Sequence, residues 1–239
     1  IALSMGFDGD SPCRVEAALT YELSHNLNNG HVFLPRDKLL SAAAQLIGAD
    51  TDALETALDG LLTRGVIVQE QVANVQACYL LRLHQAETRV ARRLLSLRDA
   101  PRQTGKNVDR IIAEMEQQQG IAYAPHQRQA VTLAAQSGVL LLTGGPGTGK
   151  TTSTRGIVTL LERMGLTVLL LAPTGRAAKR MSELCSREAQ TIHRCLGMTF
   201  NELTGEVTFK KNEKDLLEAD AVIVDEMSMV DLPLMDTLL

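Results

Sequence analysis

The chain has 239 residues, of which 45% are hydrophobic, 22% charged and only 3% aromatic, and its net charge is −4. This composition is typical of a soluble globular protein with an aliphatic core. The charge balance excludes a global attraction to nucleic acid or an acidic membrane, so such contacts must come from local patches. No apolar run approaches the roughly 20 residues of a membrane span. The four widely spaced cysteines favour reduced thiols over a zinc site.

Residues 1–84 show the element order of a winged helix. Three helical patterns precede two short strand patterns, at residues 13–29, 36–48 and 49–65, then 66–70 and 76–82. The sequence GHVFLP is expected to connect the first two helices. The third helix carries Asp52, Glu55 and Asp59 against Arg64 alone, and acids in a DNA groove would be repelled by phosphates. A structural or interdomain role is therefore favoured over direct DNA contact, which stays open.

Residues 85–118 predict a basic helical linker. Its arginines indicate either a solvated helix face or an edge that contacts phosphates, and Pro101 and Gly105 mark a domain boundary. From residue 119 to residue 239 strands and helices alternate. The sequences GVLLLTGG, LTVLLLAP and ADAVIVDE predict buried strands, which indicates an α/β domain with a parallel sheet covered on both faces. The sequence MTFNELTGEVTF predicts a surface hairpin.

Residues 144–151 match the phosphate-binding pattern G-x-x-x-x-G-K-[ST] at every fixed position, between a predicted strand and a predicted helix. Small residues let backbone N–H groups approach phosphate oxygens, and the helix dipole favours the negative charge. Lys150 would reach the β- and γ-phosphates, and the Thr151 hydroxyl would bind Mg²⁺. The loop thus predicts ATP and Mg²⁺ as cofactors. Its expected nucleotide-binding residues are Gly145, Pro146, Gly147, Thr148, Gly149, Lys150, Thr151 and Thr152.

Two further positions complete the predicted nucleotide site. Asp225 follows the apolar run AVIV, at the carboxyl end of a predicted strand, and could hold Mg²⁺. Glu226 comes next and could orient and deprotonate the attacking water, which favours hydrolysis over phosphate transfer. Gln127 precedes the phosphate-binding loop, and its amide could read an adenine edge with two hydrogen bonds. We therefore expect Lys150 and Glu226 to be catalytic, and Thr151 and Asp225 to bind the metal.

Gln127 and the sequences GGPGTGKTT, APTGRAAKRM, TIHRCLG and VDEMSM follow one another in an order and spacing that resemble the first motor domain of RecD-like DNA helicases of superfamily one. This resemblance covers residue 121 to the end. The sequences LTYELSHNLNNGHVFLPRDKL, ALDGLLTRGVIV and YLLRLHQAETRVARRL also resemble the winged-helix segment of the free-standing branch of that family. The fold implied is a RecA-like P-loop domain behind a winged-helix-like domain.

The resemblance implies a bacterial, cytoplasmic, ATP-driven helicase that moves 5′ to 3′ on single-stranded DNA and unwinds duplexes in recombination or repair. Its partners would be single-stranded DNA, junctions of single- and double-stranded DNA, and other recombination or repair proteins, with no membrane. The residues implied to contact the DNA backbone are Pro173, Thr174, Thr191 and His193. Local structural roles for these four positions stay open: a threonine cap, for example, or a core histidine.

Three alternatives stay open. The chain could be the motor subunit of a helicase–nuclease complex (the exodeoxyribonuclease V alpha subunit), the helicase part of a conjugative relaxase, or a DNA-binding protein that only senses nucleotide. The chain starts without Met and stops within an apolar helical pattern, so we expect a piece of a longer protein. The family has a second motor domain with an arginine that reaches the γ-phosphate. We therefore expect this chain alone to bind nucleotide weakly or not at all, and to hydrolyse it negligibly.

Overall fold

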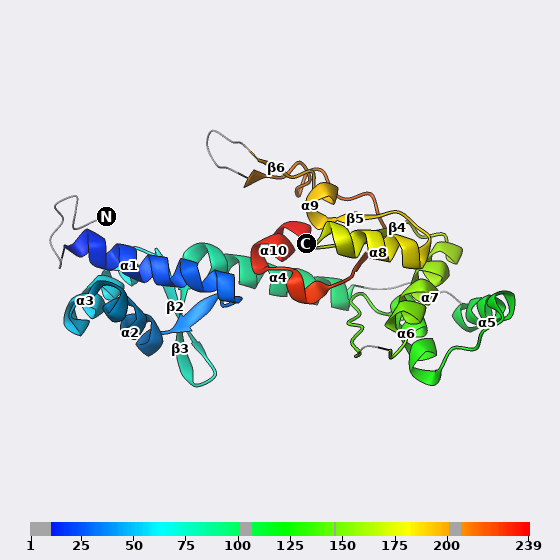
Figure 1. Ribbon diagram of the computed structural model, residues 1–239, viewed down its shortest axis with the longest axis horizontal. Coiled ribbons are helices and arrows are strands. Elements are labelled where there is room, and N and C mark those ends of the chain that lie inside the picture. Colours follow the sequence, from blue (N-terminus) through cyan, green and yellow to red (C-terminus); the bar gives the residue numbers. More distant parts are fainter. Residues whose placement is uncertain (1–10, 101–106, 146, 201–206) are drawn as a thin grey trace. The chain divides into compact units, whose positions relative to one another are not determined.

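The computed structural model describes residues 11–100, 107–145, 147–200 and 207–239, and it divides the chain into two compact units (Figure 1). The first unit comprises the residues up to Val90 together with Asp231–Asp236, and the second comprises Ala91–Val230 with Thr237–Leu239. The boundary residues Pro101 and Gly105 lie outside the described residues. Across the described ranges, no helix is both long enough and apolar enough to cross a membrane.

The first unit is helical with one small antiparallel sheet. Its elements are α1 (Pro12–His25), the 3-10 turn η2 (Asn26–Asn29), β1 (Phe33–Pro35), α2 (Arg36–Ile47), α3 (Thr51–Thr63), β2 (Ile67–Val72) and β3 (Val75–Leu80), after which α4 (Leu81–Asp99) begins. The strand order is β1-β3-β2. Three helices followed by a two-stranded hairpin confirm the predicted winged-helix-like order.

Strand β1 corrects the expectation that GHVFLP is a mere connector. Phe33 lies opposite Tyr79 and Pro35 lies opposite Ala77 in the antiparallel register with β3. The rings of Phe33 and Tyr79 are 5.1 Å apart, and such cross-strand aromatic pairs stabilise a sheet. Pro35 is tolerated because β1 is an edge strand, where a missing N–H breaks no ladder.

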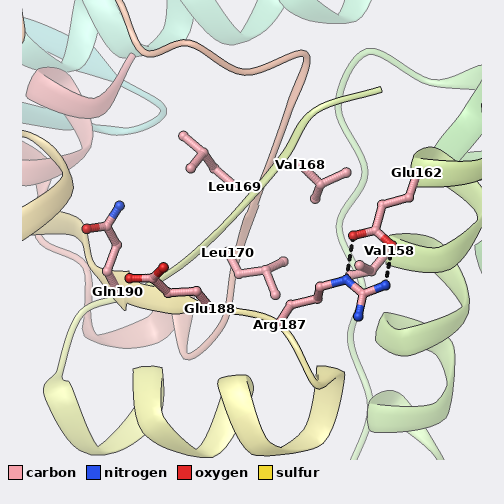
Figure 2. A pocket seen from close by; sticks show the side chains of 8 residues that line it. All are labelled: Val158, Glu162, Val168, Leu169, Leu170, Arg187, Glu188 and Gln190. Carbon is pink, nitrogen blue, oxygen red and sulfur yellow. Dashed lines mark hydrogen bonds and ion pairs between the residues drawn. The ribbon is translucent and has the colours of Figure 1, made fainter. Parts of the chain in front are cut away.

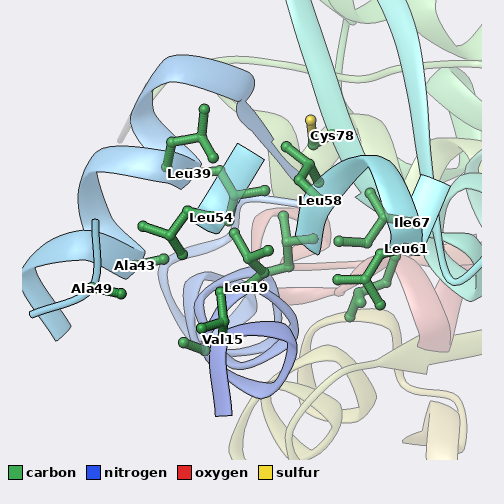
Figure 3. Close-up of a cluster of buried hydrophobic side chains, with 14 of the residues drawn as sticks. Val15, Leu19, Leu39, Ala43, Ala49, Leu54, Leu58, Leu61, Ile67 and Cys78 are labelled. Atoms are coloured by element: carbon green, nitrogen blue, oxygen red, sulfur yellow. The ribbon is translucent and has the colours of Figure 1, made fainter. Parts of the chain in front are cut away.

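Leucines from all three helices of the first unit form its core (Figure 3). Leu19 of α1, Leu39 of α2 and both Leu54 and Leu58 of α3 are fully buried. Burying each such side chain contributes roughly 1.5–3 kcal/mol to folding. At the start of α3 the Asp50 carboxylate accepts the Thr51 N–H at 2.8 Å, so Asp50 caps this helix.

The second unit contains a parallel three-stranded sheet. Its elements are α5 (Val108–Gln119), α6 (Pro125–Gln136), α7 (Lys150–Arg163), β4 (Val168–Ala172), α8 (Gly175–Cys185), β5 (Ala189–Thr191), α9 (Ile192–Cys195), β6 (Thr199–Phe200), β7 (Val207–Thr208), β8 (Ala221–Val224) and the 3-10 turn η3 (Met227–Met229). The last helix of the chain, α10 (Leu232–Leu238), belongs mostly to the first unit. The strand order β5-β4-β8, parallel throughout, is consistent with the predicted RecA-like P-loop domain.

The predicted surface hairpin is confirmed, because β6 and β7 pair antiparallel with Phe200 opposite Val207. The turn between them lies outside the described residues. Strand β5 was not expected from the sequence. It has only three residues, and its parallel pairing places Thr191 opposite Ala172.

The expectation of a strand at GVLLLTGG is wrong. Residues 138–145 have no regular secondary structure, and Leu141 is 81% exposed. At the start of this segment Gly138 approaches α4 so closely that a Cβ would overlap the Leu97 carbonyl oxygen. An apolar run predicts that a segment is buried, but it does not predict which strand the segment pairs with. Here the backbone of residues 138–145 runs outside the sheet.

Helices α5, α6 and α7 pack together and against β4 and β8. Ile112 and Met115 of α5, Val131 of α6 and Leu160 of α7 are fully buried in one shared cluster. Helices α6 and α7 meet at Gly156, where a Cβ would lie 2.8 Å from Val131 Cγ2 and 2.9 Å from the Tyr123 hydroxyl oxygen. A glycine is therefore required by close packing at this crossing.

Substituting Gly156 and Gly60 by alanine should change stability in opposite directions. Gly156→Ala should destabilise the second unit by about 1–3 kcal/mol, because Val131 and Tyr123 must shift. Gly60→Ala places its methyl in ordinary contact within α3 and should stabilise the first unit by about 0.5–1 kcal/mol. Hydrogen-exchange mass spectrometry of peptides from α7 and α3 measures both effects. Equal protection of α7 before and after Gly156→Ala would contradict the close packing.

Candidate nucleotide and DNA site

The phosphate-binding loop adopts a glycine-dependent backbone immediately before α7. Gly147 and Gly149 have φ values of +76° and +82°, in the left-handed region that favours glycine. The Thr148 hydroxyl donates to the Gly145 carbonyl oxygen at 2.8 Å, which closes the loop on itself. Helix α7 then begins at Lys150. Pro146, the remaining predicted loop residue, lies outside the described residues.

The side chains at the start of α7 are accessible to a ligand. Lys150 and Thr151 are exposed, and Thr152 is half-buried. Within the described ranges, neither the Lys150 ammonium nor the Thr151 hydroxyl makes a side-chain hydrogen bond to protein. Since the first N–H groups of a helix have no partner inside the helix, this terminus presents N–H donors, a cation and a hydroxyl. That set of groups suits a polyphosphate.

Gln127 lies against the phosphate-binding loop. Its Oε1 accepts the Ala124 N–H at 3.0 Å, at the beginning of α6. A Cβ built on Gly149 would overlap the Gln127 amide nitrogen. The Gln127 amide therefore packs directly against the loop backbone. No sequence pattern predicted this contact.

The parallel sheet gathers most of the other predicted residues at its carboxyl edge. Leu171 is opposite Val224 and Ala172 is opposite Thr191, so β4, β5 and β8 end at the same level. The Asp225 N–H donates to the Leu171 carbonyl oxygen at 3.0 Å, which extends the β8 pairing by one residue. Pro173 and Thr174 continue from β4 at this edge.

Two of the predicted DNA-contact residues cap helices. The Thr174 hydroxyl accepts the Ala177 N–H at 3.2 Å at the start of α8, and the Thr191 hydroxyl accepts the Arg194 N–H at 3.2 Å at the start of α9. A hydroxyl that accepts in this way still has its own hydrogen to donate. The cap role and a contact with a phosphate are therefore compatible.

Pro173 and His193 are each half-buried. The His193 carbonyl oxygen accepts the Met198 N–H at 2.9 Å, which closes the turn after α9. His193 is thus neither a core histidine nor a fully exposed one. It lies one helical turn or less from Thr191, on the segment that follows β5.

Asp225 and Glu226 are exposed where β8 ends. Glu226 has φ +55°, a left-handed conformation that is uncommon for a residue with a side chain, and η3 follows it. In the described parts of the chain, no hydrogen bond or ion pair joins a side chain of the phosphate-binding loop to either acid.

The charge of Asp225 also acts on the thiol of Cys185. Burial raises the pKa of the Cys185 thiol, Arg155 opposes that shift and Asp225 adds to it.

A cavity of about 300 Å³ opens elsewhere in the second unit (Figure 2). It lies beside β4 and is bordered by α7 and by the segment that leads into β5. Arg187 and Glu162 form an ion pair at 2.7 Å on its wall. None of the eight residues that line the cavity belongs to the predicted nucleotide or DNA site. The predicted site is thus an exposed edge instead of this cavity.

The acids of α3 are exposed to solvent, and several arginines of α4 are paired with carboxylates. Helix α3 exposes Asp52, Glu55 and Asp59, and Asp59 pairs with Arg36 at 2.9 Å. On α4 several arginines already pair with carboxylates: Arg89 with Asp236 at 2.6 Å, Arg93 with Glu213 at 2.6 Å and Arg98 with Asp99 at 2.7 Å. Those pairings favour a solvated, ion-paired helix face over a free phosphate-binding edge.

Glu116 and Arg128 are residues near the site that sequence reasoning missed. Glu116 Oε2 accepts from Arg128 Nη1 at 2.7 Å, and Glu116 Oε1 accepts the Tyr123 N–H at 2.9 Å. Burial and the Glu116 charge raise the pKa of Tyr123, while Arg155 and Arg163 oppose that shift. The one feature of the sequence that could have indicated Arg128 is its position next to Gln127. Glu116 lies in a stretch that carries no motif.

Comparison with known proteins places this site in a family context. A family described as "AAA domain" matches residues 127–239. The chain is 34% identical over 242 aligned residues to the ATP-dependent RecD2 DNA helicase of Deinococcus radiodurans, which covers 96% of this chain and 32% of that protein. The chain therefore spans about a third of the length of this relative.

Several other relatives carry the name RecBCD enzyme subunit RecD, and two of them serve as examples. The one from Haemophilus influenzae is 30% identical over 195 residues, covering 68% of this chain and 29% of the relative. The one from Mycobacterium tuberculosis is 36% identical over 132 residues, covering 46% of this chain and 22% of the relative. Similarity to a RecD2 protein thus extends over both units of the chain.

Removing the cap at Thr174 should loosen α8 without unfolding the unit. Thr174→Ala should cost about 1 kcal/mol, because the Ala177 N–H loses its acceptor, and Thr174→Ser should retain most of that stability. Thr159→Ala is the matched control, since the Thr159 hydroxyl bonds a carbonyl oxygen within α7 and caps nothing. Denaturant unfolding measures all three variants. A loss for Thr174→Ala no larger than for Thr159→Ala would show that the cap contributes nothing.

Proposed function

We propose, since the chain contains a RecD-like superfamily-one helicase motor region, that the full-length protein is an ATP-dependent DNA helicase. It would move 5′ to 3′ along single-stranded DNA and unwind duplex DNA in recombination or repair. The observation that carries the proposal is the position of Gln127 against Gly149 of the phosphate-binding loop. This contact joins a residue suited to an adenine edge to a loop suited to phosphates. Such a pairing supports ATP as the fuel.

The residues present fit a nucleotide with a bound divalent ion. The Thr151 hydroxyl and the Asp225 carboxylate are hard oxygen donors of the kind that Mg²⁺ prefers. Among the residues that the structure describes, no group of three or more His, Cys, Asp or Glu side chains could hold a metal by itself. The proposed ion would therefore take its remaining oxygens from phosphate and water. When bound, it would neutralise charge on the phosphates.

Glu226 supplies the proposed hydrolytic step. Its carboxylate would accept a proton from a water molecule while the water oxygen forms a bond to the γ-phosphorus. The bond from that phosphorus to the oxygen bridging the β- and γ-phosphates breaks at the same time, and the product ADP keeps that oxygen. Lys150 would stabilise the charge on the γ-phosphate. The exposure of Glu226 leaves room for this geometry.

The carboxyl edge of the sheet would hold the DNA strand. Pro173 and Thr174 follow β4 at this edge, Thr191 is the last residue of β5, and His193 lies just beyond it. Asp225 follows β8 at the same edge. Both threonine hydroxyls can donate to a phosphate oxygen while they cap α8 and α9. Proximity of the strand path to the metal-binding acid would couple DNA movement to the nucleotide cycle.

One alternative has a specific observation in its favour. Several relatives are named as RecBCD subunits, so this protein could be the motor subunit of a helicase–nuclease complex. The match to the H. influenzae subunit covers 68% of the chain, whereas the match to the RecD2 helicase covers 96%, including the winged-helix-like unit. The wider coverage favours a free-standing helicase. Purification of the protein with or without bound partners distinguishes the two.

Glu226→Gln separates a motor from a nucleotide sensor. In the full-length protein this variant should bind ATP with unchanged affinity and lose about 10²–10⁴-fold in hydrolysis, because the amide cannot accept the proton. Because unwinding depends on hydrolysis, the variant should also fail to unwind DNA. Lys150→Ala is the companion variant and should weaken ATP binding itself. Nucleotide binding by fluorescence and phosphate release give the two readouts. A Glu226→Gln protein that still unwinds DNA would exclude the proposed role.

The 239-residue chain alone should bind ATP at least about tenfold more weakly than the full-length protein. Residues 138–145 lie outside the sheet, so the phosphate-binding loop is anchored mainly through α7 and Gln127. We expect a loop anchored in this way to lose affinity, because a binding conformation that is only partly populated lowers the apparent affinity. Hydrolysis by this chain should be negligible, with or without DNA. Isothermal titration and a phosphate-release assay on both proteins check this. DNA-stimulated turnover at the full-length rate would contradict it.

A further inference from the structure

Glu116 holds two parts of the chain with one carboxylate. It lies near the end of α5, and its Oε1 accepts the backbone N–H of Tyr123 at 2.9 Å. Its Oε2 accepts from Arg128 Nη1 at 2.7 Å. The exposed fraction of the Glu116 side chain is 21%, against 46% for Glu114 on the same helix. Glu116 therefore clamps the residues on both sides of the start of α6 to α5.

The clamp brackets Gln127. Tyr123 precedes the start of α6 and Arg128 follows Gln127 directly, so both attachment points flank the amide that faces the loop. The position of this segment is further fixed by the Tyr123 ring, which is buried against Gly156 of α7. With α5 on one side and α7 on the other, the beginning of α6 has little freedom to move.

The Gln127 amide is oriented by this local structure. Its Oε1 accepts the Ala124 N–H, which directs its Nε2 toward Gly149. A carboxamide oxygen has two lone pairs and its nitrogen two hydrogens, so each atom keeps capacity for a ligand. An amide held this way can accept from the exocyclic amine of adenine and donate to the adjacent ring nitrogen. Guanine presents a carbonyl oxygen where adenine presents the amine, so the same orientation disfavours GTP.

We propose that Glu116, through its ion pair with Arg128 and its bond to the Tyr123 N–H, is a positioning residue that holds Gln127 for selection of adenine. The inference rests on the proposed ATP-driven function, and it adds a residue of α5 to the residues that select the base. Glu116 lies outside the residues that match the AAA domain, so the base-selecting apparatus reaches further toward the N-terminus than that match.

The Glu116–Arg128 ion pair should matter more for the choice of nucleotide than for folding stability. Arg128 is about one-third exposed and its second carboxylate neighbour, Asp109, is 3.5 Å away and largely exposed. Ion pairs with this much solvent contact add little to folding stability. The same pair can nevertheless fix an orientation, because it acts together with the bond to the Tyr123 backbone. Loss of Glu116 should thus affect nucleotide choice more than folding.

The test measures hydrolysis of ATP and GTP by the full-length protein in the presence of single-stranded DNA. Glu116→Gln should raise the KM for ATP, leave kcat within about twofold, and lower the preference for ATP over GTP by about fivefold or more. Arg128→Lys, which keeps the positive charge, should retain more of that preference than Arg128→Ala. Glu114→Gln is the matched control, because among the described residues Glu114 forms an ion pair only with the exposed Arg110 on α5. Melting temperatures establish that each variant is folded.

A double variant identifies the route of the effect. If Glu116 acts through Gln127, Glu116→Gln combined with Gln127→Ala should lose no more preference for ATP than Gln127→Ala alone. Additive losses would overturn the inference. The inference would also be overturned if Gln127→Ala lost the preference for ATP while Glu116→Gln or Arg128→Ala kept it. The proposed function would still stand after that result. A wild-type protein that hydrolyses no nucleoside triphosphate would remove the proposed function and this inference together.

Discussion

The parallel pairing of β4 with β5 and β8 is the constraint on which the proposed site depends. Parallel strands that end at one level deliver the residues after them to one edge, whatever their distance in sequence. Thr174, Thr191 and Asp225 come from three separate segments, yet the register sets them at the same edge. Helices then build on that edge, since Thr174 and Thr191 begin α8 and α9.

A second requirement is the close packing of α6 on α7. Gly156 removes the side chain that would separate the two helices, and Gly149 leaves space that the Gln127 amide fills. Because α7 begins where the phosphate-binding loop ends, any shift of α6 would reach the loop through Gln127. Helix α5 adds the Glu116 carboxylate to the same assembly. The proposed base recognition and phosphate binding would thus share one set of packed helices.

Sequence patterns predicted those parts whose chemistry is local. Helix periodicity follows from neighbouring residues, and so does the glycine pattern of the phosphate-binding loop, in which Gly147 and Gly149 have left-handed φ values. Features that depend on distant partners were missed. The apolar run at 138–145 did not reveal that it lies outside the sheet, and β1 and β5 are too short to carry a strand pattern. Nothing in the sequence around Glu116 indicates its clamp, because both partners are set by tertiary packing.

The measurement that tests the proposed motor most directly is strand displacement by the full-length protein on partial duplexes with either a 5′ or a 3′ single-stranded tail. We expect ATP-dependent separation of the 5′-tailed duplex and little of the 3′-tailed one. Separation should fail when ATP is omitted. Efficient binding of both substrates with no displacement of either, while ATP is hydrolysed or merely bound, would contradict the helicase function.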